Sequence, residues 1–318
     1  MRYSHPFLFY RSMKWITIFL RVFLGAMFLT SGALKLFPIE FFELNFIDMG
    51  VANFMTAPII ARLVIGLEWM LGLFLLLNIK LKQFTLPASA LLLVAFNIYL
   101  IYELIAEGNR GNCGCFGTYL QMTPLQSIIK NVGLILIIIL LWKIYQRRTY
   151  RYVNWIAIIS VATSLSLPFI LNPVDFLNAK NLQPEATNFP LRKDLILEKN
   201  TFGAPPVDLF AGKHVIAFMS LTCPYCKQAA FKIHVIHERY PEIPFLFFLN
   251  GKDKDVDEFF AETKSENIEH FRMSAIPFLK FTQGSFPTIF WVNNGIVEKK
   301  SDYYTLTEEE LLQWWKSP

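Results

Sequence analysis

Cysteine is scarce in this sequence, with only four residues among 318. All four lie in two close pairs, Cys113-Gly114-Cys115 and Cys223-Pro224-Tyr225-Cys226, and none is left over. A thiol with a second thiol one or two residues away is placed to make and break a disulfide. The pattern therefore favours thiol–disulfide chemistry over cysteines that only hold a fold together.

Metal-binding side chains are sparse too, with five histidines in the chain. A structural disulfide or half a zinc site is the alternative interpretation of the second cysteine pair. Zinc needs about four ligands at suitable spacing. His234 and His237 follow the pair, but neither is placed near Cys223. We therefore expect no metal and interpret both histidines as solvated helix residues.

Polar residues are too few for an ordinary soluble protein, since 54% of the residues are hydrophobic and the mean hydropathy is +0.38. An apolar run of about 20 residues can cross roughly 30 Å of hydrocarbon. Five such runs occur before about residue 175: Trp15–Leu36, Ala57–Leu77, Pro87–Ile105, Leu125–Trp142 and Trp155–Leu171. None follows, so we expect five membrane-spanning helices and then a soluble domain.

Basic residues are nearly absent from the loops on one side of these helices, 37–56 and 106–124, which contain only Arg110. The other side carries nine: Arg2, Arg11, Lys14, Lys80, Lys82, Lys143, Arg147, Arg148 and Arg151. The positive-inside rule then predicts a multi-pass protein of the cell (inner) membrane with a cytoplasmic N-terminus. Five crossings place the C-terminal domain, and both cysteine pairs, on the extracytoplasmic side, where disulfides persist. The net charge of +5 comes from the inner loops and indicates no nucleic-acid partner.

The C-terminal region alternates expected strands and helices, which predicts an α/β fold with a mixed sheet. The second cysteine pair directly follows the first strand and opens the first helix. Cys-Pro-Tyr-Cys at such a junction resembles the active site of the thioredoxin superfamily. The expected strands are His214–Leu221, Ile243–Leu249 and Thr288–Val292, and the helices are Lys227–Arg239, Val256–Thr263 and Thr307–Trp315.

A second motif extends this resemblance. Phe286-Pro287 and the strand and turn after it, TIFWVNNG, are similar to the cis-proline strand and hairpin of the superfamily. The resemblance implies a cis peptide bond that sets the Phe286 backbone beside the cysteines, where it receives the extended chain of a protein substrate. Phe286, Pro287, Pro224 and Tyr225 are therefore the candidate substrate-binding residues. No cofactor is expected in this domain.

The thioredoxin resemblance also implies separate roles for the two thiols. Cys223, at the helix N-terminus, is expected to be a thiolate and the nucleophile. Cys226, one turn further along, then resolves the mixed disulfide. Thioredoxins usually carry a buried acidic residue about six positions before the first cysteine, but this chain has Ala217 there. Proton transfer to Cys226 must therefore use water or another group.

The first cysteine pair lies in a motif, Cys113-Gly114-Cys115-Phe116-Gly117, that resembles the methylamine-utilisation protein E (MauE) family, relatives of the DoxX membrane proteins. Residues 31–36 (SGALKL) and 66–72 (GLEWMLG) agree with that family. The resemblance covers roughly residues 10–145 and implies a four-helix unit associated with the maturation or redox state of extracytoplasmic proteins. A Cys-x-Cys disulfide closes a small, strained ring, which is typical of labile, oxidising disulfides. The alternatives are a pair of free structural thiols and a bridge to other partners.

Glu68 is the unusual residue of the second expected span. It lies near the bilayer midplane, where an ionisable group is costly and faces protein or water. Arg21 and Arg62 are its candidate partners. Glu68 is either a proton relay for a quinone-coupled reaction or half of a buried ion pair that holds the bundle. Three further ionisable residues near the outer face are expected to reach toward the interface or to pair there: Lys35, Glu103 and Lys130.

The sequence thus predicts a multidomain protein: an all-α MauE/DoxX-like four-helix unit (1–150), a fifth membrane helix (151–172), a linker (173–194) and an α/β thioredoxin-like domain (195–318). We expect a membrane-bound thiol–disulfide oxidoreductase that passes electrons between extracytoplasmic protein substrates, the Cys223/Cys226 pair and the Cys113/Cys115 pair. A quinone is the candidate acceptor, by analogy with membrane oxidases such as vitamin K epoxide reductase relatives. The alternatives are a non-enzymatic assembly factor whose thioredoxin-like domain binds clients, and a metal-handling protein whose cysteines bind a soft ion.

Overall fold

The computed structural model describes residues 6–106, 108–109, 122–145, 153–174, 184–198 and 202–317. Cys113 and Cys115 lie outside these ranges, and so do the side chains of residues 6–12. The chain divides into two compact units, Met1–Val174 and Asp175–Pro318.

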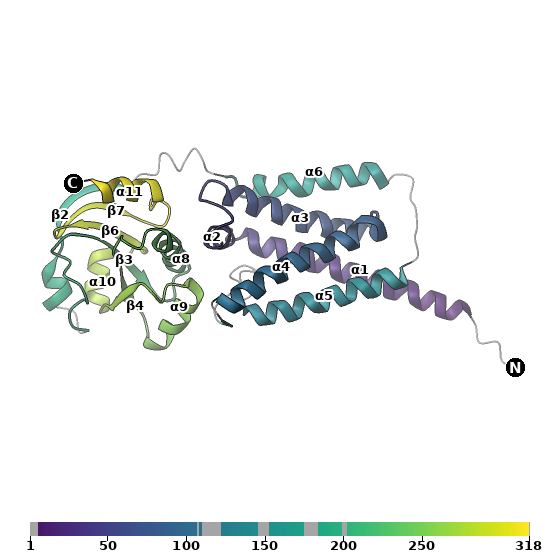
Figure 1. Ribbon diagram of the computed structural model, residues 1–318, viewed down its shortest axis with the longest axis horizontal. Helices are drawn as coiled ribbons and strands as arrows, with labels where there is room; N and C mark the ends of the chain where they lie inside the picture. Colours follow the sequence, from purple (N-terminus) through teal and green to yellow (C-terminus); the bar gives the residue numbers. More distant parts are fainter. Residues whose placement is uncertain are drawn as a thin grey trace. The chain divides into compact units, whose positions relative to one another are not determined.

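The described residues of the first unit form five long helices (Figure 1). The expected runs all fall within them, with ends that differ by at most a few residues except at the start of α1. The helices are α1 (Pro6–Leu36), α3 (Ala57–Leu77), α4 (Leu86–Ala106), α5 (Pro124–Ile144) and α6 (Val153–Leu171). A π-helical turn, η1 (Leu81–Thr85), leads into α4, and a short helix, α2 (Glu40–Asp48), was not expected from the sequence. We call the end at which α1, α4 and α6 finish and α3 and α5 begin the linker end of the bundle.

Large apolar side chains cover the outside of this bundle. Phe19, Leu91, Ile105 and Ile159 are each more than 60% exposed, and many others resemble them. Contiguous apolar surface on this scale is unfavourable in water. The five apolar helices and their exposed surface therefore describe a multi-pass membrane unit.

Glycine lets the helices approach closely. A Cβ at Gly72 of α3 would lie 2.9 Å from Leu29 Cγ and 3.0 Å from the carbonyl oxygen of Gly25, both on α1. A Cβ at Gly66, on α3, would lie 2.9 Å from the carbonyl oxygen of Ser164 on α6. Small residues at such crossings are typical of membrane helices, because association there depends on close packing.

Arg62 anchors the start of the linker rather than pairing with Glu68. Its guanidinium, 3% exposed, donates to Glu43 Oε1 at 2.6 Å and to the backbone oxygen of Asn172 at 2.7 Å. It also donates to Asn172 Oδ1 at 3.0 Å and to the backbone oxygen of Pro173 at 3.2 Å. The expected partnership with Glu68 is wrong because α2, unforeseen in the sequence, brings Glu43 to this guanidinium.

The second unit is built on a six-stranded mixed sheet of order β2-β7-β6-β3-β4-β5. β3 runs parallel to β4, β4 is parallel to β5, and the other three pairings are antiparallel. The strands are β2 (Glu185–Pro190), β3 (Lys213–Ser220), β4 (Phe245–Asn250), β5 (Glu269–Arg272), β6 (Thr288–Asn293) and β7 (Ile296–Ser301). A β3–α8–β4 crossover beside the β6–β7 hairpin is a thioredoxin-like arrangement.

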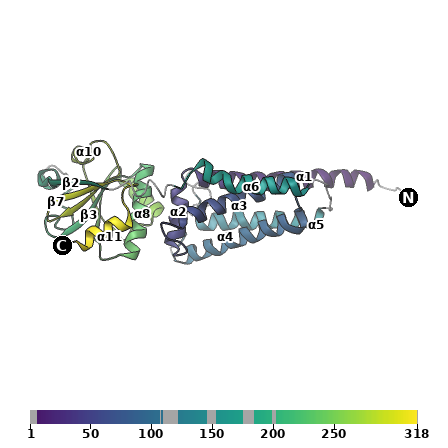
Figure 2. The same ribbon diagram turned by 90° about the horizontal axis from the view of Figure 1, so that it is seen from above.

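Helices cover both faces of this sheet. α10 contributes Phe278 and Phe281 to the core on one face, where they contact Phe218 of β3. Trp291 of β6 packs against Trp314 of α11 on the other face, with ring centroids 5.5 Å apart. Figure 2 shows the unit from a second side. The helices are α8 (Pro224–Arg239), α9 (Val256–Thr263), α10 (Ala275–Thr282) and α11 (Glu308–Lys316).

Two expectations for this region need correction. The segment 173–194 contains strand β2, which pairs with β7, so it is not a linker throughout. β2 is an edge strand with almost wholly exposed side chains and a bulge, so it lacks the apolar alternation that marks a strand in a sequence. His234 is buried rather than solvated, at 9% exposure, because its ring stacks on Phe231.

Candidate functional site: the Cys223–Cys226 pair

The two cysteines of the second unit sit at the start of α8. Cys223 is the N-cap residue, with extended backbone angles, and Pro224 follows at the first helical position. Proline is favoured there because its missing N–H has no partner in the first turn. Cys226 is fully buried, and its Sγ accepts a hydrogen bond from the backbone N–H of Ser220 at 3.3 Å. Both cysteines are free thiols, and only Cys223 is partly exposed.

The environment separates the acidities of the two thiols. The pKa of Cys223 is lowered to about 6, chiefly by a hydrogen bond from Cys226 and further by the backbone N–H groups of Cys226 and Tyr225, against the opposing effect of burial. The pKa of Cys226 is raised, first by burial and then by the neighbouring Cys223. Near neutral pH the accessible sulfur is therefore the thiolate, and the buried sulfur stays protonated.

The second expected motif lies against this thiolate. The Phe286–Pro287 peptide bond is cis, and the backbone oxygen of Phe286 lies 3.9 Å from Cys223 Sγ. This agrees with the sequence expectation for the Phe286 backbone. Ile276-Pro277, which has a similar appearance in the sequence, lies in α10 instead.

The remaining candidates differ in their access to solvent. Pro224 is exposed and Tyr225 is 55% exposed, so both can meet a protein substrate that approaches Cys223. Ala217, on β3, is fully buried, so no acidic side chain occupies the position that the family pattern reserves for one. The arrangement is suited to attack by Cys223 on a partner's disulfide, followed by resolution by Cys226.

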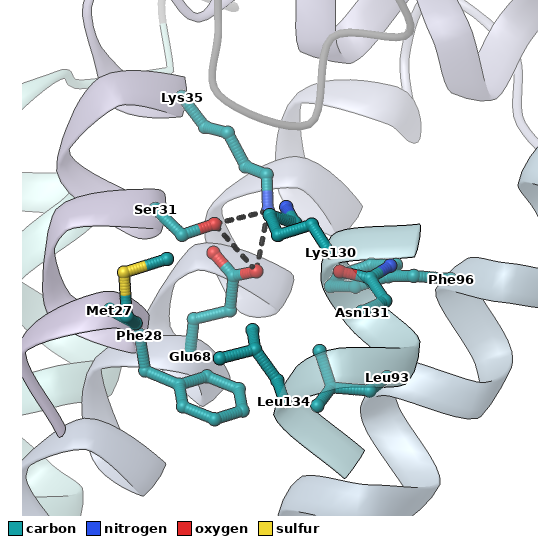
Figure 3. Close-up of a pocket in the computed structure, with 10 residues that line it drawn as sticks. All are labelled: Met27, Phe28, Ser31, Lys35, Glu68, Leu93, Phe96, Lys130, Asn131 and Leu134. Carbon is teal, nitrogen blue, oxygen red and sulfur yellow. Dashed lines mark hydrogen bonds and ion pairs between the residues drawn. The ribbon is translucent and has the colours of Figure 1, made fainter. Parts of the chain in front are cut away.

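The other predicted residues lie in the membrane unit. Glu68 is 2% exposed, and its Oε1 lies 2.5 Å from Lys35 Nζ and 3.3 Å from Ser31 Oγ (Figure 3). Neither expected partner pairs with it: Arg62 binds Glu43, and Arg21 donates to the backbone oxygen of Leu76 at 3.5 Å. The sequence analysis expected Lys35 to reach toward the interface or to pair near the outer face, but it did not identify Glu68 as the partner of Lys35.

The Cys113/Cys115 prediction falls outside the described residues. The flanking helices are described: α4 ends at Ala106 and α5 begins at Pro124. The start of α5 is fixed by a capping box in which the side chains of Thr123 and Gln126 bond to each other's backbone N–H groups. The segment that carries the first cysteine pair thus joins two helices at the linker end of the bundle.

A thiolate at a helix N-terminus, a buried second thiol three residues on and an adjoining cis-proline loop define a thiol–disulfide oxidoreductase of the thioredoxin-like class. The membrane unit has its own match: residues 13–144 fit the family model described as methylamine utilisation protein MauE. The first unit is thus similar to the MauE family over these residues, and a thioredoxin-like unit follows it in this chain.

Two further comparisons place the chain among known proteins. It is 26% identical over 298 residues to Protein TlpB of Flavobacterium psychrophilum, a match that covers 78% of this chain and 80% of that protein. The chain is also similar to the crystal structure of the thioredoxin domain of a thiol-disulfide oxidoreductase from Bacteroides vulgatus. That match covers 41% of this chain and 94% of the solved chain, with 14% sequence identity and a TM-score of 0.29.

Proposed function

We propose that this protein exchanges thiols and disulfides with protein substrates on the extracytoplasmic side of the inner membrane. Cys223 is the attacking thiolate and Cys226 the resolving thiol. The main support for these roles is the contrast between the two cysteines. Cys223 is partly exposed and has a pKa lowered to about 6, whereas Cys226 beside it is fully buried. The carbonyl of Phe286, 3.9 Å from Cys223 Sγ, lies where it can align a substrate backbone.

The proposal extends to an electron relay within the chain. Cys113 and Cys115 form a second dithiol/disulfide couple, and they exchange electrons with the Cys223/Cys226 pair. In each exchange one dithiol loses two electrons and two protons as its S–S bond forms, and the other disulfide gains them. The presence of a second close cysteine pair on the same chain, and a tether that keeps the domains at an effective concentration of about millimolar, support this relay.

A quinone is the proposed terminal partner of the relay. Its reduction to hydroquinone takes up the two electrons and two protons that a dithiol releases. The support is architectural, since a helical membrane unit gives a lipid-soluble oxidant access to a dithiol in the same membrane.

Trapping the relay tests this function. Replacement of Cys226→Ala removes the resolving thiol, so a mixed disulfide between Cys223 and the membrane unit should accumulate in the oxidised full-length protein. Protease cleavage between the units, followed by non-reducing electrophoresis, detects it, and the fragments should separate on reduction. The matched control is Cys223→Ala with Cys226 intact, which should trap nothing because Cys226 is buried.

The same variants separate the possible outcomes. In the Cys226→Ala background, Cys113→Ser and Cys115→Ser should each abolish the internal product, because either one removes the disulfide that Cys223 attacks. Addition of a short-chain quinone to reduced full-length protein should oxidise the thiols only when Cys113 and Cys115 are present. If Cys226→Ala yields mixed disulfides with other proteins but none within the chain, the internal relay is wrong and the membrane unit serves the thioredoxin-like domain as an anchor.

A further inference from the structure

A small cavity inside the membrane unit adjoins the Lys35–Glu68 pair (Figure 3). The two side chains are 3% and 2% exposed. The volume of the cavity is about 20 Å³, which is enough for a water molecule and far below the several hundred Å³ of most small-molecule pockets. A quinone ring does not fit in it. Its polar lining comes from Ser31, Lys35, Glu68, Lys130 and Asn131.

Glu68 retains an unused acceptor beside this cavity. Lys35 Nζ and Ser31 Oγ both bind its Oε1, whereas Oε2 is buried and has no hydrogen-bond partner among the described residues. Figure 3 shows the carboxylate directed toward the lysines and Ser31. A buried carboxylate oxygen without a protein donor is costly unless water supplies one. The geometry therefore indicates a water molecule bound to Glu68.

The Arg62–Glu43 pair shows how a structural ion pair in the same unit differs. The nitrogens of Arg62 find acceptors in Glu43, in the backbone oxygen of Pro58 and in residues 172–173. No polar atom of either residue of that pair is left buried and unbonded among the described residues. The Glu68 pair differs by the unbonded Oε2 of Glu68 and by the adjoining cavity. An ion pair that only holds the bundle together requires neither feature.

The charged groups around Glu68 come from several helices. α1 contributes Lys35, whose Nζ also lies 4.6 Å from the ring centre of Phe96. α5 contributes Lys130, and α4 lines the cavity with Leu93 and Phe96. Glu43 of α2 binds Arg62, and α6 has no titratable residue. Two lysines and one carboxylate therefore line the same cavity.

Buried polar residues continue from this cavity to the linker end of the bundle. Asn131 donates to Asn97 Oδ1 at 3.0 Å and is 2% exposed. Ser127, one turn closer to the start of α5, is fully buried, and Glu103, near the end of α4, is 3% exposed. Polar side chains within membrane helices are costly and usually face a protein or water path. The series ends at the helix termini that the Cys113/Cys115 segment connects.

We propose that the Lys35–Glu68 cavity is a proton-exchange site for the redox chemistry of the membrane unit. The inference rests on the proposed function, in which a dithiol of this unit is oxidised by a quinone. Each oxidation forms one S–S bond and releases two electrons and two protons, and the quinone takes up both as it is reduced to hydroquinone. Glu68 accepts one of these protons through its bound water, becomes a neutral carboxylic acid beside Lys35, and passes the proton on.

Infrared difference spectroscopy of the full-length protein in lipid nanodiscs tests this assignment. Spectra are recorded at successive times after a quinone is mixed with the dithiothreitol-reduced protein, with free thiols counted in parallel. We expect a transient carboxylic acid C=O band that shifts in D₂O. Glu68→Gln should remove this band, and Glu43→Gln, the matched change in the structural pair, should leave it in place.

The outcomes distinguish this inference from the proposed function. If the thiols of Cys113 and Cys115 cycle but no band depends on Glu68, the proton-exchange role is wrong and the relay stands. If those thiols never cycle, the relay itself fails. Should Glu68→Gln not fold, Ser31→Ala provides the test, because loss of the hydrogen bond to Oε1 must shift the band. An unchanged band in that variant overturns the assignment.

Discussion

Cys223 acquires its low pKa from hydrogen bonds rather than from a neighbouring charge. The causes are the Cys226 thiol and two backbone N–H groups, and no ionised side chain is among them. Dissolved salt screens the interaction between exposed charges, but it has little effect on short hydrogen bonds from groups that the start of the helix holds in place. The thiolate is therefore a property of the first turn of α8, and its acidity is built into that turn.

The pH dependence of alkylation tests this origin. In a full-length protein with Cys113→Ser and Cys115→Ser, the rate of Cys223 alkylation by iodoacetamide should rise with a midpoint at about pH 6. Raising the salt concentration should leave the midpoint almost unchanged. Cys226→Ala should move it upward, since the largest cause of the lowered pKa is lost. A midpoint unchanged by Cys226→Ala would contradict the assignment.

The same pKa has a consequence for stability. The folded value of about 6 lies below the value of about 8.5 in an unfolded chain. Unfolding therefore takes up a proton between these two pH values, and the stabilising effect is complete above about pH 8.5 and lost as the pH falls to about 6. Over that range the free energy of unfolding of the reduced protein should rise with pH relative to Cys223→Ala. Chemical denaturation at several pH values measures the difference.

At the scale of elements, the α1–α3 crossing depends on the absence of side chains. A Cβ at Gly72 would contact the backbone oxygen of Gly25 at 3.0 Å, and backbone cannot swing aside as a side-chain end can. Gly133 of α5 is the contrast, because nothing lies within 4 Å of a Cβ built there. The two glycines occupy similar helices but differ in what surrounds them.

Alanine at each position separates packing from helix propensity. Gly72→Ala should destabilise the bundle by about 1–3 kcal/mol, as overpacking does. Gly133→Ala should be neutral or stabilise by up to about 1 kcal/mol, because alanine favours the helix. The thermal midpoint of the purified protein in detergent measures both. Equal midpoints for the two variants would show that α1 and α3 are not packed as described.

The elements also show what a single sequence can reveal. The membrane helices are foreseeable because their apolar runs need no partner to be recognised, and Cys223–Cys226 because a local motif places both thiols. Strand β2 could not be foreseen, because its strand character comes from pairing with β7 rather than from its own sequence pattern. The partner of Glu68 was missed for a related reason: Lys35 lies 33 residues away and meets Glu68 only when α1 packs on α3.

For the whole molecule, the position of β2 shortens the tether between the two units. The sequence suggested a linker of about 20 residues, but β2 begins at Glu185 and the Arg62 anchor holds Asn172 and Pro173. About ten residues therefore remain between Val174 and Glu185, which fully extended span roughly 35 Å. Both ends of this tether are fixed by described contacts, so in the proposed relay its length would set the effective concentration of one cysteine pair at the other.

Changing the tether tests whether the relay is intramolecular. Insertion of about ten Gly/Ser residues after Val174 doubles its length, and the effective concentration should fall as roughly the −3/2 power, or about threefold. The rate of electron transfer from reduced Cys223/Cys226 to oxidised Cys113/Cys115, followed by rapid acid quenching and thiol labelling, should fall by the same factor. Insertion of the same residues between Asn294 and Gly295, at the β6–β7 turn, controls for added chain. A rate that does not change with tether length but increases with protein concentration would mean that the two cysteine pairs react between molecules, so that one chain oxidises another.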